Sequence, residues 1–229
     1  MNLPFLNKKN YIVLKAYTYN SAYLEHSPIT LANRECPVKS RGFEGVSSTT
    51  FSGCFGRIMG LSKSATIYMP TNIEFAATSC GSVSHVYSDE RSTGFNVSYD
   101  HAEDPDYVTK DTVLSKIELP WMLEETTGAM FVLAKHILNK TMMNIPTGVI
   151  AFNNQHALNV FNLIPKLDFN YQVNLNTPTV SLYPMSEKKL IVESHHDVAK
   201  YEELVNRNTY RPYWSANAVK MAKSKGCPV

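Results

Sequence analysis

The chain has 229 residues, 44% of them hydrophobic, and its 22 basic and 20 acidic residues give a formal net charge of +2. This length and apolar content exclude disorder over most of the chain and suit one large all-β domain, or less comfortably two small ones. Because the charges are spread along the whole sequence, they argue against a nucleic-acid partner. No stretch approaches the roughly 20 apolar residues that cross a bilayer, so we expect no membrane partner.

The N-terminal segment and the cysteines predict a protein that folds in a reducing cytosol. The start, MNLPFLNKKN, has too short an apolar run for a signal peptide. The four cysteines, Cys36, Cys54, Cys80 and Cys227, lack the CxxC pairing that structural zinc sites usually show. We therefore expect free thiols and no bound cofactor.

The first strand is predicted at Tyr11–Tyr17, where Ile12, Leu14 and Ala16 fall on one face and Tyr11, Val13 and Tyr17 on the other. The segment Thr18–Ser64 is rich in Ser, Gly, Thr, Pro and Asn, which predicts long loops around short pieces of structure. Within it, Phe55–Leu61 could form one helical turn.

Short apolar or alternating segments between turn residues predict the remaining strands. Those in the first half of the chain are Ala65–Met69, Ile73–Ala77, Gly94–Tyr99 and Val113–Leu119. We expect Pro120 to stop the last of these strands. The segment Gly128–Ile137 fits a strand or a helix, and its strand-like neighbours favour a strand. The others are Gly148–Phe152, Ala157–Ile164, Asn170–Asn174, Thr179–Tyr183 and Lys189–Glu193.

The periodicity becomes helical near the C-terminus. Four apolar residues fall on one helical face, namely Val198, Tyr201, Leu204 and Val205. They predict a helix from about Asp197 to Asn208, capped by Ser194 or a nearby residue. A second helix is predicted from Ser215 to Gly226, with lysines near its end.

The order of these elements predicts the fold class. About ten strands followed by two helices imply an α+β, predominantly β fold, either an antiparallel β-sandwich or a partly closed sheet with two C-terminal helices. We expect a single domain, in which residues 1–194 form a β-rich body and residues 195–229 form a helical tail packed on it.

Several short motifs follow one another along the chain. They are Cys36-Pro37, YMPTNI at 68–73, Leu119-Pro120-Trp121, GVIAFNNQH at 148–156 and Asn159-Val160-Phe161. In general character, over roughly residues 30–215, the chain resembles tailed-bacteriophage proteins of unknown function. The resemblance implies a phage origin, a β-rich fold and a location in the host cytoplasm or the virion. It transfers no active-site residue.

One spacing suggests metal chemistry. His195 and Asp197 have the His-x-Asp spacing that begins the two-histidine, one-carboxylate iron site of oxygenases. No histidine follows His196, so the second histidine would have to come from earlier in the chain, such as His101 or His156. The other interpretation is a polar loop that caps the next helix.

One aromatic segment suggests a protein interface. Tyr210, Arg211, Tyr213 and Trp214 lie in the sequence NTYRPYW, and Tyr, Trp and Arg dominate interface energetics. The other interpretation is a helix connector whose aromatic rings pack back on the sheet.

The sequence assigns no catalytic residue. Cys54 lies in a Gly-flanked loop, but nothing places a base beside it, and no glycine-rich phosphate loop occurs. We therefore expect a phage structural or protein-interaction protein without catalytic activity, with a virion component as one version, whose partners are copies of itself or other subunits. The alternative is a small metal-dependent enzyme of the non-haem iron type that uses His195 and Asp197.

Overall fold

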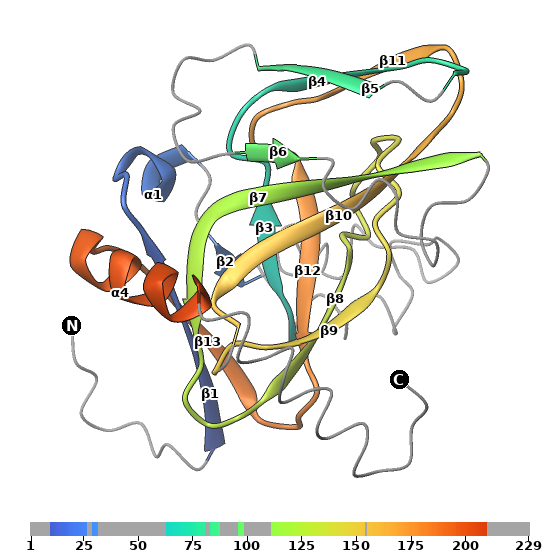
Figure 1. Ribbon diagram of the computed structural model, residues 1–229. Helices are drawn as coiled ribbons and strands as arrows, with labels where there is room; N and C mark the ends of the chain where they lie inside the picture. Colours follow the sequence, from blue (N-terminus) through green and yellow to red (C-terminus); the bar gives the residue numbers. More distant parts are fainter. Residues whose placement is uncertain are drawn as a thin grey trace, which may run out of the picture.

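The computed structural model (Figure 1) describes residues 10–26, 29–31, 63–80, 83–87, 96–98, 111–153 and 155–209. These residues form three β-sheets and two helices, which confirms the α+β, predominantly β class. The helices are α1 (Ala22–His26) and α4 (Val198–Thr209). No helix in this part of the chain is long and apolar enough to cross a membrane.

Sheet A contains five strands in the order β10-β7-β1-β13, with β6 also beside β7. Strands β1 and β13 run parallel over eight residue pairs, and the other neighbours are antiparallel. The strands are β1 (Tyr11–Thr18), β6 (Asn96–Ser98), β7 (Thr112–Glu124), β10 (Ala157–Pro165) and β13 (Lys189–His196).

Two further sheets are entirely antiparallel. Sheet B has the order β2-β3-β12-β8-β9, and sheet C has the order β11-β4-β5. The strands of sheet B are β2 (Thr30–Leu31), β3 (Ala65–Tyr68), β8 (Met130–Lys135), β9 (Gly148–Ala151) and β12 (Pro178–Pro184). Those of sheet C are β4 (Ile73–Ala77), β5 (Val83–Tyr87) and β11 (Phe169–Val173).

The inner faces of the three sheets share one hydrophobic core. Strand β10 shows the underlying pattern, because its buried and half-buried residues alternate along its whole length. Trp121 of β7 is 1% exposed, and Phe131 and Phe152 meet in this core with their ring centroids 5.4 Å apart. Burial of each such side chain contributes about 2–3 kcal/mol to the free energy of unfolding.

The prediction that Pro120 stops its strand is wrong, because β7 continues through it to Glu124. On one side of β7, the pairing with β6 ends at Glu118 and the pairing with β1 begins at Met122. On the other side, the register with β10 shifts between the pairs at Glu118 and Met122. Pro120 therefore lies where a missing N–H costs the ladder little, and β7 bends sharply along its course (Figure 1).

Most of the other predicted elements are confirmed within one to three residues, including Gly128–Ile137 as strand β8 and the helix α4. Strand β5 was not predicted. Its valines and serines give a weak pattern, and its place is set by antiparallel pairing with β4. The predicted turn at Phe55–Leu61 and the helix Ser215–Gly226 lie outside the described residues.

Candidate interaction surface

Helix α4 covers part of the outer face of sheet A, the face turned away from the core. Leu204 is fully buried against Tyr17 of β1 and Met122 of β7, and Tyr201 and Val205 pack around them. Burial raises the pKa of Tyr201 to about 12, with smaller contributions from nearby Tyr19 and Glu118. Three of the four residues of the predicted apolar face therefore pack on the sheet, whereas Val198 is 43% exposed.

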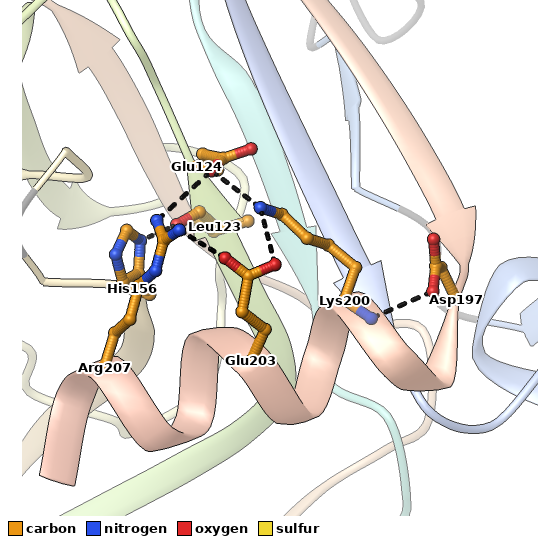
Figure 2. Close-up of polar contacts among 7 residues, drawn as sticks. All are labelled: Leu123, Glu124, His156, Asp197, Lys200, Glu203 and Arg207. Carbon is orange, nitrogen blue, oxygen red and sulfur yellow. Dashed lines mark hydrogen bonds and ion pairs between the residues drawn. The ribbon is translucent and has the colours of Figure 1, made fainter.

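Four charged side chains form a closed ring beside this contact (Figure 2). The ammonium of Lys200 lies 3.1 Å from Glu124 and 3.2 Å from Glu203. Arg207 pairs with the same two carboxylates, 3.8 Å from Glu124. Burial alone would lower the pKa of Lys200, but its hydrogen bonds to the two glutamates raise it overall. The ring joins three residues of α4 to the end of β7.

The two residues of the predicted metal site, His195 and Asp197, have different partners in the structure. Asp197 is the N-cap of α4, because its Oδ1 accepts a hydrogen bond from the backbone N–H of Lys200 at 2.9 Å. His195 lies in β13, stacks on Tyr17 with ring centroids 5.5 Å apart, and approaches Glu193 to 3.6 Å. The segment therefore caps the next helix, as the other interpretation expects, but it lies at the end of strand β13 rather than in a loop.

The described residues supply no third metal ligand beside His195 and Asp197. His101 lies outside the described residues. Among the residues that are described, no group of three or more His, Cys, Asp and Glu side chains could hold a metal ion. The metal assignment stays a prediction.

The aromatic residues of the predicted protein interface also lie outside the described part of the chain, which ends at Thr209. The prediction for Tyr210, Arg211, Tyr213 and Trp214 therefore stays a prediction.

Two buried histidines have structural hydrogen bonds. The Nδ1–H of His156 donates to the backbone oxygen of Leu123 at 2.9 Å (Figure 2). In His136, Nδ1 accepts from the backbone N–H of Leu138 at 3.1 Å, and Nε2 lies 3.3 Å from the hydroxyl of Thr66. Because Nδ1 accepts, Nε2 carries the proton of the neutral ring. The contacts to Leu123 and Thr66 join residues far apart in the sequence, so no local pattern predicts them.

The outer face of sheet B is apolar beside strand β9. Alternation places Phe131 and Ile150 toward the core and their neighbours on the opposite face. Six neighbouring outward positions, which we call the sheet B stripe, are Met130, Val132, Val149, Ala151, Tyr183 and Met185. Solvent-facing positions of an antiparallel sheet are usually polar, yet no charged residue occurs among these six.

The register brings the stripe together in two rows. Val132 lies between Val149 and Tyr183, and Met130 lies opposite Ala151. The backbone N–H of Met185 donates to the oxygen of Met130 at 2.8 Å, which continues the second row. Val149 is 61% exposed, Met185 56% and Met130 48%. Large apolar side chains of β8, of β9 and of the residue after β12 are therefore near one another and open to solvent.

Strand β9 is also an open edge. In the described part of the chain it pairs only with β8. Edge strands normally carry charges or proline that prevent pairing with other chains, but β9 has the sequence GVIA. The outer face of sheet C differs, because it carries Glu74 and Gln172 among its exposed residues.

A hollow of about 250 Å³ adjoins the stripe. Its lining includes Gly128, Met130, Met185 and Lys188. Small-molecule pockets are usually larger, about 300–1,000 Å³. The hollow is of a size that a side chain of a protein partner can enter.

Comparison with known proteins gives no guide to function, because no family model, curated protein or solved structure matches this chain.

Proposed function

We propose that this protein is a structural or protein-interaction protein, and that the sheet B stripe with the open edge of β9 binds another protein subunit. The exposure of Val149, Met130 and Met185 side by side carries the proposal. Contiguous exposed apolar patches mark interaction sites. Met and Tyr are enriched and charges are depleted in interface cores, as in this stripe.

The phage origin and a place in the virion are also proposals, supported by the sequence resemblance over roughly residues 30–215. An edge that can accept a strand suits subunit assembly, because backbone pairing gives affinity and alternate side chains give specificity. Mass spectrometry of purified particles tests this part. Absence of the protein from the particles would remove the virion proposal and leave a factor of the infected cell.

Site-specific photo-crosslinking tests the binding proposal. A photoreactive residue at position 149 should form an adduct with a defined protein in cells that make the chain. The same residue at position 86 is the matched control, because Val86 is also an exposed valine on a strand that pairs with one neighbour in the described part. Equal or absent adducts at both positions would contradict the proposal.

A further inference from the structure

We infer that the partner of this surface is a second copy of the chain, joined by antiparallel pairing of β9 with the β9 of that copy across a two-fold axis. The inference rests on the proposed function and names its partner. Pairing of this kind makes sheet B of the two copies continuous. It also pairs outward N–H and C=O groups of β9 in both copies at once, apart from the oxygen of Ala151, which already accepts a hydrogen bond from the backbone N–H of Gln155.

Charge favours self-association at this edge. A two-fold contact brings each residue near its own copy, so a charged strand risks like-charge repulsion. Strand β9 and the stripe beside it contain no charged residue. Strand β9 can therefore pair with its own copy without like-charge repulsion.

The alternation of side chains limits the register. Directly paired residues point to the same face of a sheet, and a two-fold axis perpendicular to the sheet leaves each face on its own side. Ile150 points to the core side and Val149 to the outer side. Val149 must therefore lie opposite Val149 or Ala151 of the second copy. In either register the two Val149 side chains are direct or diagonal neighbours, and the two stripes merge into one.

Sedimentation velocity of the full chain tests the inference. The wild type should form a dimer, and Val149→Lys should raise the dissociation constant at least tenfold, because it places two like charges near the axis. Val86→Lys is the matched control, since Val86 is 66% exposed on β5. It should leave the dimer unchanged. Circular dichroism of each variant checks that the fold is kept.

A charge-swap experiment makes the test specific to self-contact. Val149→Glu should also weaken the dimer, and an equimolar mixture of Val149→Lys and Val149→Glu should restore association. A monomeric wild type, equal dissociation constants for Val149→Lys and Val86→Lys, or failure of the mixture to associate would each overturn the inference. If the photo-crosslinker at position 149 nevertheless captures a different protein, the proposed function stands and only the identity of the partner is wrong.

Discussion

The outer faces of sheets A and B are similar in sequence but differ in their exposure to solvent. Both carry apolar residues at outward positions, Tyr17 and Met122 on sheet A and Met130 and Val149 on sheet B. On sheet A, helix α4 covers them and Leu204 becomes fully buried. On sheet B the side chains stay exposed. An outward apolar row indicates a covering element, which can come from the same chain or from another one.

The rims of the two faces differ as well. Charged residues surround the covered face of sheet A, where Glu124 joins Lys200 and Arg207 of α4. Such pairs fix the position of a helix more than they stabilise it. The sheet B stripe has no charged member that would fix a partner in this way. Backbone pairing at β9 would set the geometry there instead.

The largest expected effect comes from removing the side chain that anchors α4. Leu204→Ala should lower the free energy of unfolding by about 2–4 kcal/mol, because it leaves a cavity under the helix. Val149→Ala should change it by less than about 0.5 kcal/mol in the monomer, since Val149 is exposed. Urea denaturation at low protein concentration measures both. Similar losses for the two variants would remove the distinction between a covered and an open face.

A smaller loss is expected at the cap of α4. Asp197→Ala should cost about 1 kcal/mol of unfolding free energy, because the backbone N–H of Lys200 loses its acceptor. Asp197→Asn keeps a side-chain oxygen and should cost little. If Asp197 instead held a metal, the asparagine variant would lose bound metal in elemental analysis, whereas capping alone predicts no change in metal content.

The ring of charges should contribute slightly less than the cap. Glu124→Gln removes the carboxylate shared by Lys200 and Arg207, and we expect a loss of about 0.5–1 kcal/mol. Glu203→Gln is the control, because its side chain is 44% exposed whereas that of Glu124 is 16% exposed. Thermal unfolding in low and high salt measures both variants. An equal or larger effect at Glu203 would show that burial does not decide the strength of these pairs.

The smallest effect near neutral pH is expected from Tyr201. Its pKa rises from 10.0 to about 12 in the folded state, so the folded protein holds this proton more tightly than the unfolded chain. The resulting stability is complete below pH 10 and is lost as the pH rises toward 12. Tyr201→Phe should therefore weaken the fall in unfolding free energy over this range. An unchanged alkaline profile would mean that Tyr201 is not buried between α4 and sheet A.

The spacing of apolar residues was enough to predict most strands and helix α4, because a half-buried strand or helix repeats its apolar positions over a few neighbouring residues. Non-local features could not be predicted in this way. Whether Pro120 ends β7 depends on where β6 and β1 stop and start. The parallel pairing of β1 with β13 brings together residues 11–18 and 189–196, which are far apart in the sequence, so no local pattern predicts it.

The candidate surface was harder to predict than the fold. Met130 and Val149 lie in segments that were correctly predicted as strands. In β9, however, the apolar residues Val149, Ile150 and Ala151 are consecutive, so the sequence does not say which of them faces the core. That choice follows from pairing with β8, which places Ile150 opposite buried Phe131.

Hydrogen exchange at two protein concentrations tests the central claim most directly. If β9 pairs with a second copy, backbone amides of residues 148–151 should exchange more slowly in the concentrated sample, while those of residues 83–87 in β5 should exchange at the same rate in both. Equal exchange of residues 148–151 at both concentrations, across a range that spans the micromolar region, would contradict the account.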